Sequence, residues 1–251
     1  MPRPYILVAP TGARRSKEDH PVLPIKTDEI IQTAKDCSAV GAQGLHLHVR
    51  DARGHHTLDP GIYRETLAEL AQHVPDMDVQ ITTEAASKFD VPTQLACLDG
   101  VKPSWASISV REIARDPTLA DRVYGTCAQN GTRVQHIMYD VADVALLTDW
   151  QSRGIVRPDQ NDVIFVLGRY TTGQVSSPAD LALFLDAFGG GGKWMVCAFG
   201  QNEHACLQAA ARLGGDVRVG FENNLWSADG TVFADNAASV LALSQSIGDA
   251  S

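Results

Sequence analysis

The sequence lacks the features that mark secreted and membrane-spanning proteins. Its five cysteines, at positions 37, 97, 127, 197 and 206, are odd in number and form no Cys-x-x-Cys pair. This excludes both a disulfide framework and a cysteine-rich zinc site. No stretch approaches the ~18 uninterrupted apolar residues that a membrane span needs, and the apolar run in the opening MPRPYILVAP is too short for a signal peptide. We therefore expect a cytoplasmic protein with no membrane partner.

Positive charge is also scarce. The chain has 21 Lys and Arg residues against 30 Asp and Glu residues, for a formal net charge of -9. Because the basic residues are scattered and binding to phosphates needs a concentrated basic surface, we expect no nucleic-acid partner. What the chain does have is 44% hydrophobic residues in a length of 251, which is enough for a substantial core.

Short apolar runs alternate with amphipathic stretches from one end of the chain to the other. This alternation is typical of parallel βα units, and eight such units favour a closed barrel over an open sheet. With no break in composition and no long linker, we expect one domain over residues 1–251, an α/β fold of the (β/α)₈ TIM barrel type. The expected strands are residues 5–10, 44–50, 78–84, 105–110, 133–139, 162–168, 193–199 and 216–222.

The segment HLHVRD (46–51) carries the chemistry that stands out most. His46 and His48 are two residues apart on an expected strand, so both side chains point to the same face, which in a barrel is the interior. Barrel enzymes place their active sites at the carboxyl ends of the strands. Glu222, near the end of the last expected strand, completes a set of two imidazoles and one carboxylate that leaves a position open on zinc. The alternative for Glu222 is an ion pair with Arg218 on the same strand.

Several polar residues near the ends of neighbouring strands are candidates for substrate binding. Hydroxyl groups at a barrel rim suit the binding of a carboxylate, although they can equally be exposed residues at the start of a loop. Arg14, Arg15, Arg111 and Arg169 are candidates for anionic groups, CoA phosphates included. His136 is a core residue or a rim contact, and we expect His55 and His56 to be exposed in a loop. The substrate-binding candidates are Thr82, Thr83, Ser107, Ser109 and Arg50, with Glu84 beside them.

Four segments of the chain resemble the β-keto acid cleavage enzyme family, typified by 3-keto-5-aminohexanoate cleavage enzyme. They are HLHVRD, GGDVRVGFENN (214–224), VAPTGA (8–13) and VLP (22–24), and the similarity extends over essentially the whole chain. The resemblance implies a zinc-dependent (β/α)₈ enzyme, usually a homotetramer. Such an enzyme converts a β-keto acid and acetyl-CoA into acetoacetate and a new acyl-CoA.

The same resemblance assigns roles to particular residues. The metal ligands of the family fall on His46, His48 and Glu222, and the arginine partner of its catalytic acid falls on Arg218. The substrate-binding hydroxyls fall on Thr82 and Ser107. Zinc would act as a Lewis acid that stabilises an enolate. The enolate would attack acetyl-CoA, and a retro-Claisen step would release acetoacetate.

Three features of the sequence depart from the family pattern, and one of them covers two positions. Asn223 stands where members resembling the prototype carry an aspartate that is thought to be the base, and an amide cannot accept a proton as a carboxylate does. Glu84 and Ala85 replace two glycines, and Gln135 replaces a glutamate. We therefore expect Glu84 to be the catalytic base if the family chemistry persists. Otherwise Asn223 marks a changed reaction.

Two other functions remain open on the sequence alone. A metal-dependent hydrolase of the amidohydrolase type also begins with His-x-His on a barrel strand. That class needs histidines on strands five and six and an aspartate ending strand eight, and this chain offers only His136 and Glu222 at those places. The second alternative is a barrel that binds a metal or a small carboxylate without catalysis.

Overall fold

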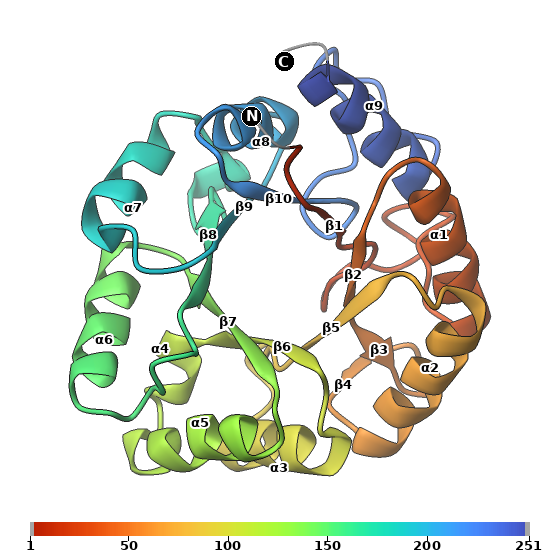
Figure 1. The fold of residues 1–251 in the computed structure, drawn as a ribbon. Coiled ribbons are helices and arrows are strands. Elements are labelled where there is room, and N and C mark those ends of the chain that lie inside the picture. The colour runs from red at the N-terminus through yellow and green to blue at the C-terminus, as the bar shows by residue number, and fades with distance from the viewer. Residues whose placement is uncertain (1–2, 249–251) are drawn as a thin grey trace.

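The computed structural model describes residues 3–248, which fold around a closed barrel of eight parallel strands surrounded by helices (Figure 1). Neighbouring strands follow the order β1-β10-β9-β8-β7-β6-β5-β2. The expected (β/α)₈ barrel is thereby confirmed. The barrel strands are β1 (Ile6–Val8), β2 (Gly44–Leu47), β5 (Asp78–Thr82), β6 (Trp105–Ser109), β7 (Arg133–Met138), β8 (Asp162–Leu167), β9 (Trp194–Ala198) and β10 (Asp216–Val219).

The second expected strand differs from the prediction, because it is interrupted at His48. After β2 the chain leaves the barrel and forms β3 (Val49–Arg50), which pairs antiparallel with β4 (His56–Thr57). The Asp51 carboxylate causes this turn by accepting hydrogen bonds from the backbone N–H groups of Arg53 and His55, both at 2.9 Å. The last strand is also shorter than expected. It ends at Val219, so Glu222 lies in the turn that follows.

Helices cover the outer surface of the barrel (Figure 1). Several of them begin at an aspartate whose carboxylate accepts a hydrogen bond from a backbone N–H in the first turn, as Asp59, Asp90 and Asp140 do. No helix within residues 3–248 is long and apolar enough to cross a membrane. The helices are α1 (Thr27–Ala39), α2 (Pro60–His73), α3 (Val91–Val101), α4 (Val110–Ile113), α5 (Ala120–Gln129), α6 (Val141–Ser152), α7 (Asp180–Phe188), α8 (Glu203–Arg212) and α9 (Asn236–Gly248), with 3₁₀ turns η1 (Pro117–Leu119) and η2 (Thr172–Gln174).

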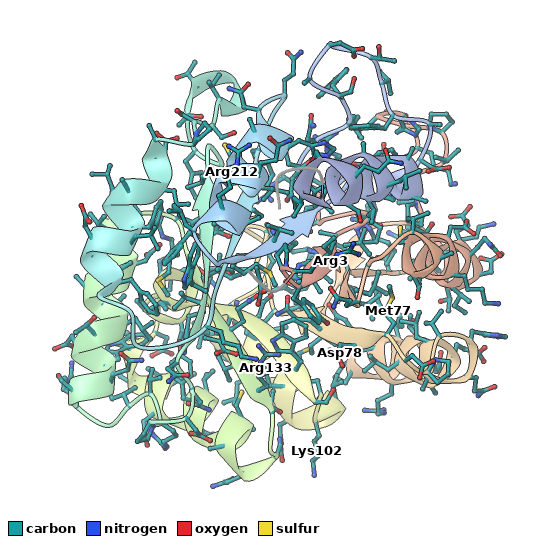
Figure 2. The ribbon with its side chains drawn as sticks, turned by 45° about the horizontal axis from the view of Figure 1, so that its top comes forward. Arg3, Met77, Asp78, Lys102, Arg133 and Arg212 are labelled. Carbon is teal, nitrogen blue, oxygen red and sulfur yellow. The ribbon has the colours of Figure 1, made fainter. Side chains whose placement is uncertain are left out.

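Alternate residues of each strand pack into two separate cores. One set packs between the barrel and the helices, and a smaller set fills the barrel interior. The interior set is Leu7, Trp105, Ile137, Ile164, Val166, Met195, Cys197 and Phe199. Arg133 and Asp78 lie at the end where the strands begin (Figure 2). The guanidinium of Arg133 is 4.6 Å from the centre of the Trp105 ring, and the Tyr5 hydroxyl donates a hydrogen bond to Asp78. Aromatic and charged side chains therefore pack together at this end.

Candidate active site

A cavity of about 520 Å³ lies at the end of the barrel where the strands finish. Its volume is in the range of small-molecule sites. The lining combines charged side chains with an apolar wall from the barrel interior. The residues are Thr11, Gly12, Ala13, Arg14, Arg15, Asp19, His46, Thr82, Glu84, Ile137, Tyr139, Val166, Arg169, Gly173, Phe199, Gly200, Arg218, Glu222, Leu225 and Trp226.

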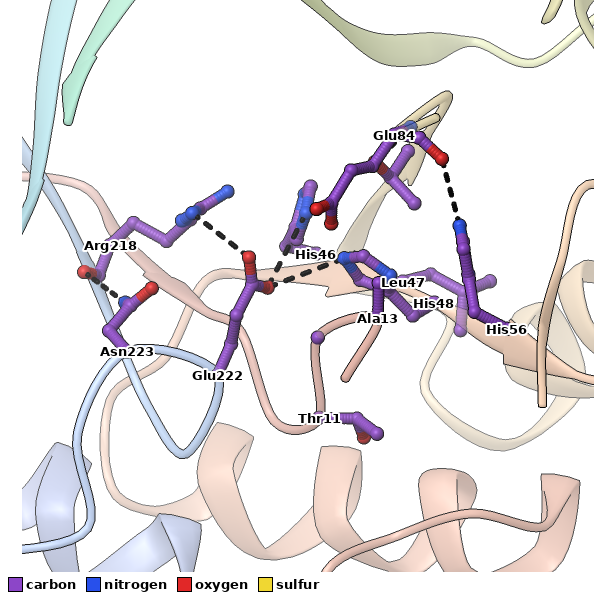
Figure 3. A network of polar contacts seen from close by, with 12 residues as sticks. Thr11, Ala13, His46, Leu47, His48, His56, Glu84, Arg218, Glu222 and Asn223 are labelled. Carbon is purple, nitrogen blue, oxygen red and sulfur yellow. Dashed lines mark hydrogen bonds and ion pairs between the residues drawn. The ribbon is translucent and has the colours of Figure 1, made fainter. Parts of the chain in front are cut away.

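His46, His48 and Glu222 converge at this cavity, as Figure 3 shows. Glu222 Oε2 lies 3.7 Å from His46 Nε2 and 3.4 Å from His48 Nε2. One ligand atom from each of the three residues falls within 4.8 Å of the other two. The fold thus brings together His46 from β2, His48 from the position just after β2, and Glu222 from the turn after β10.

The three side chains fit a divalent metal. Both ring nitrogens of buried His48, and Oε2 of Glu222, have no hydrogen-bond partner within residues 3–248. Burial and the nearby charge of Arg218 lower the pKa of His46 to about 3, so its imidazole is neutral and can donate a lone pair. Burial alone would raise the pKa of Glu222, but Arg218 holds it well below its usual range. Two neutral imidazoles and one carboxylate are the donor set of catalytic zinc sites.

A chain of side-chain amides orients His46. Gln80, in β5, donates from Nε2 to Oε1 of Gln135 at 2.9 Å, so its own Oε1 is left to accept from His46 Nδ1 at 2.7 Å. The proton on His46 is therefore on Nδ1, and the lone pair of Nε2 faces Glu222. Such an outer contact fixes the tautomer of a metal-binding histidine. The sequence pattern gave no indication of the role of Gln80.

Glu222 is fixed from two sides. Its Oε1 accepts a hydrogen bond from Arg218 Nη2 at 3.3 Å. The sequence left open whether Glu222 pairs with Arg218 or lies beside the histidines, and the structure shows both contacts. On the other side, Gly12 packs directly against it. Gly12 has a φ of +70°, and a Cβ at this position would lie 2.6 Å from Cγ of Glu222. A glycine is needed there for both reasons.

Asn223 points away from the cavity into the wall of the barrel and is fully buried. Its Nδ2 lies 3.2 Å from Oε1 of Glu203 and 3.4 Å from the carbonyl oxygen of Arg218. Glu203, the first residue of α8, is also fully buried, and burial raises the pKa of its carboxyl to about 8. Nothing in the sequence marked Glu203 as a partner of this position.

Glu84, unlike Asn223, lines the cavity. Its Oε1 accepts a hydrogen bond from Arg14 Nη1 at 2.6 Å, and its side chain is 13% exposed. The backbone carbonyl of Glu84 accepts a hydrogen bond from Nε2 of His56 at 2.9 Å, which holds the loop after β5 (Figure 3). His56 is therefore buried, and the expectation that it would be exposed is wrong, because the β3–β4 hairpin folds it back onto His48. His55 is exposed as expected.

The hydroxyl candidates divide between the two faces of their strands. Thr82 lines the cavity and accepts a hydrogen bond from the Glu84 backbone at 3.0 Å. Thr83 faces outward and donates to the carbonyl oxygen of Ser107 at 3.1 Å. Ser107 and Ser109 share the interior face of β6 with Trp105, and their buried hydroxyls have no hydrogen-bond partner in the described part of the chain. Neither serine is among the residues that line the cavity.

Arg50 and His136 lie outside the cavity lining. The guanidinium of Arg50 donates to the carbonyl oxygens of Gly12, Ala13 and Arg15, so it holds the loop after β1 in place. His136 is a core residue on the outer face of β7, where its Nε2 lies 2.9 Å from the carbonyl oxygen of Gln160. It is therefore not available as a metal ligand, which removes the support for an amidohydrolase site.

Residues 4–250 match the family model described as β-keto acid cleavage enzyme. A 3,5-dioxohexanoate:acetyl-CoA acetone transferase of Paraburkholderia graminis is 27% identical over 96% of this chain and 89% of its own length. A 3-keto-5-aminohexanoate cleavage enzyme of Fusobacterium nucleatum subsp. nucleatum is 26% identical over 94% of this chain and 88% of its own length.

Solved structures share the fold. A structure described as a binary complex of ObcA with oxaloacetate superposes with a TM-score of 0.65 and 17% identity over 92% of this chain. The chain spans 65% of the length of that protein, and the likeness is one of architecture. The family match extends over both His46 to His48 and Glu222, the two segments that meet at the cavity. The chain belongs to the β-keto acid cleavage enzyme family.

Proposed function

We propose that this enzyme uses a zinc ion held by His46, His48 and Glu222 to convert a β-keto acid and acetyl-CoA into acetoacetate and a new acyl-CoA. One observation carries the proposal. The ring nitrogens of His48 and Oε2 of Glu222 have no hydrogen-bond partner among the described residues, and His48 Nε2 lies 3.4 Å from Glu222 Oε2. The relative in Paraburkholderia graminis, whose name includes acetyl-CoA, supports the choice of co-substrate. A homotetramer, implied by the sequence resemblance, is part of the proposal and is measurable by light scattering.

The residues around the trio would prepare the substrate for removal of a proton from C2. When bound, the metal supplies a Lewis acid that stabilises negative charge on the ketone oxygen. Arg218, which is buried and bonded to Glu222, adds a fixed positive charge at the cavity wall. The apolar side chains of Ile137 and Val166 exclude water from this wall. Thr82 presents its hydroxyl to the substrate carboxylate.

Glu84 is the carboxylate placed to act as base in this proposal. Arg14 bonds one of its oxygens, Oε1, and the structure assigns no hydrogen bond to Oε2 among the described residues. Glu84 Oε2 would take the C2 proton, and the C2 electron pair would form a bond to the thioester carbonyl of acetyl-CoA. The CoA thiolate leaves and then attacks the C3 carbonyl of the original keto acid. The C2–C3 bond breaks, and C2 recovers a proton from Glu84 as acetoacetate leaves.

Asn223 would have no part in proton transfer. Its side chain is an amide, and it contacts Glu203 and the backbone of Arg218 instead of the cavity. Its role in the proposal is to fix the turn that carries Glu222. The base of the reaction would therefore sit on the loop after β5 rather than in the turn after β10.

The proposal is tested by measuring acyl-CoA formation in zinc-loaded Glu84→Gln and Glu84→Ala proteins. We expect kcat to fall by roughly 10²- to 10⁴-fold, the usual effect of losing a general base, with zinc content unchanged. Glu65→Gln, which removes an exposed carboxylate from α2, is the matched control and should keep wild-type activity. Wild-type turnover in Glu84→Ala would remove Glu84 from the mechanism. Absence of product from every β-keto acid with the zinc-loaded wild type would overturn the function itself.

A further inference from the structure

The cavity carries a charge opposite to that of the chain. Its lining contains four arginines, Arg14, Arg15, Arg169 and Arg218, and three carboxylates, Asp19, Glu84 and Glu222. The formal net charge of the lining is thus positive, whereas that of the whole chain is -9. A divalent metal at His46, His48 and Glu222 would add to the excess. A positive cavity in an acidic protein attracts anions and repels cations.

Two of the four arginines in the lining are already neutralised by a carboxylate. Arg14 is 2.6 Å from Glu84, and Arg218 is 3.3 Å from Glu222. Arg111, the remaining basic candidate from the sequence, does not line the cavity. It contacts Asp140 at 2.6 Å and Asp143 at 2.7 Å, on the outer side of the barrel wall. The positive excess of the cavity therefore resides on Arg15 and Arg169, which together outweigh the one remaining carboxylate of the lining, Asp19.

Arg15 and Arg169 have no carboxylate within ion-pair distance among residues 3–248. Arg15 is partly buried, which lowers its pKa, and its backbone carbonyl is held by Arg50 at 3.1 Å. Arg169 rests over the ring of Phe199, with its guanidinium 4.8 Å from the ring centre. Phe199 positions the guanidinium of Arg169, and Arg50 positions the backbone of Arg15. Neither guanidinium forms an ion pair, although the charge of Asp19 lies close enough to Arg15 to offset part of its desolvation. A desolvated guanidinium gains most from a carboxylate, which it binds through two parallel hydrogen bonds.

The backbone around Arg169 is built for this position. Gly168, which precedes it, has a φ of +74°, and a Cβ there would lie 2.9 Å from the backbone N of Ser176. The close approach brings the end of β8 against the segment that leads into α7. Arg169 therefore leaves the barrel at a fixed angle, toward the cavity and onto Phe199.

We propose that the substrate is a β-keto acid with a second carboxylate at the far end of its tail, and that Arg15 and Arg169 bind this second carboxylate. The inference rests on the proposed function, in which the first carboxylate and the ketone lie at the end of the cavity formed by His46, Thr82 and Glu222. The apolar side chains of Ile137, Val166 and Phe199 then face the methylene groups between the two ends.

Other ligand groups match the cavity less well. The names of three sequence relatives specify different tails: one with a second ketone, one with an amine and one, the 3-oxoadipate:acetyl-CoA acetyltransferase of Cupriavidus necator, with a second carboxylate. An amine would meet a net positive lining, because Glu84 is already bonded to Arg14. The phosphates of CoA are separated from the thioester by the long pantetheine arm. A cavity of about 520 Å³ that also holds the keto acid is too small to enclose that arm and the phosphates together.

The experiment compares two six-carbon substrates that differ only at the far end, 3-oxohexanedioate and 3-oxohexanoate, with the zinc-loaded full-length enzyme. We expect wild type to prefer the diacid by at least tenfold in kcat/KM. Arg169→Gln and Arg15→Gln should each lower this preference by about tenfold or more, with no change in KM for acetyl-CoA. Arg153→Gln, which removes the same charge from an exposed position just after α6, should keep the wild-type preference.

Each contrary result has a distinct meaning. Equal kcat/KM for the two acids in wild type overturns the inference and leaves the proposed function intact. If Arg169→Gln and Arg15→Gln lower kcat/KM equally for both acids and raise KM for acetyl-CoA, the two arginines bind the phosphates of CoA and the inference is wrong. If no keto acid is turned over, the proposed function fails. In that case, calorimetry measures the affinity of the protein for unreactive hexanedioate and hexanoate. The inference holds if wild type binds hexanedioate more tightly and Arg169→Gln does not, and it fails if wild type binds both acids equally.

Discussion

The side-chain amide of Asn223 lies 3.2 Å from the carboxyl of Glu203, and both residues are fully buried. An amide can donate a hydrogen bond to that carboxyl, whereas an aspartate in its place would bring two carboxyls together at a fully buried position. Glu203 also accepts from the backbone N of Gly220 at 3.2 Å, so it fixes the turn before Glu222. The asparagine that departs from the family pattern is therefore matched to a carboxyl supplied by α8.

Replacement of Asn223 by aspartate should destabilise the protein as pH rises. Two buried carboxyls at hydrogen-bond distance cannot both ionise. We expect Asn223→Asp to lose roughly 2–3 kcal/mol of unfolding free energy at pH 8 and less at pH 5, measured by urea unfolding. Adding Glu203→Gln to the same chain restores a donor and should recover at least half of the loss. A loss independent of pH, or no recovery in the double variant, contradicts the pairing.

The contribution of Glu203 to stability should fall between about pH 5 and pH 8. Burial raises the pKa of Glu203 to about 8 in the folded chain, above its ordinary value of 4.5. Over this interval the folded state keeps a proton that the unfolded state has released, so the unfolding free energy falls as pH increases. Over this interval we expect the unfolding free energy of wild type to fall by roughly 2–4 kcal/mol relative to that of Glu203→Gln, in which every other group titrates as before. Parallel pH profiles for the two proteins would contradict the assignment.

Gly12→Ala should weaken metal binding as well as stability. The added methyl would collide with Glu222, and the left-handed backbone adds strain of about 1 kcal/mol. Gly154→Ala is the matched control, because Gly154 has a φ of +71° and no atom within 4 Å of the added Cβ. We expect similar strain in both variants, but a loss of zinc affinity of about tenfold or more only in Gly12→Ala, measured by competition with a chelator. Equal affinities in the two variants contradict the contact.

Gln80→Leu should lower zinc affinity without opening the barrel. The change keeps the side chain near its original size but removes the acceptor for His46 Nδ1, and loss of such an outer contact costs about 10- to 100-fold in metal affinity. Gln135→Leu, one step further from His46, should have a smaller effect, because Gln80 keeps its contact with the ring. The two variants can be compared in one chelator titration. An equal effect of both changes would show general loosening of the interior instead.

The sequence predicted the barrel and the convergence of its histidines with Glu222 because both depend on period-two patterns and on strand order. It could not show that the chain leaves the barrel after His48, since that turn is made by the Asp51 side chain and buries His56. The direction of Asn223 was equally hidden, because it depends on Glu203 from another element. Hydroxyls that alternate along a strand, such as Thr82 and Thr83, were assigned together although only one faces the cavity.

The two histidines and Glu222 come from opposite ends of the chain, and they meet at the seam where β1 pairs with both β2 and β10. During synthesis the histidines emerge early, but their carboxylate partner is made only after all eight barrel strands. A nascent chain thus holds two imidazoles without the third ligand until its last strand closes the ring. Tight metal binding would then begin only when the barrel is complete, and an incomplete chain would have a lower affinity for the ion.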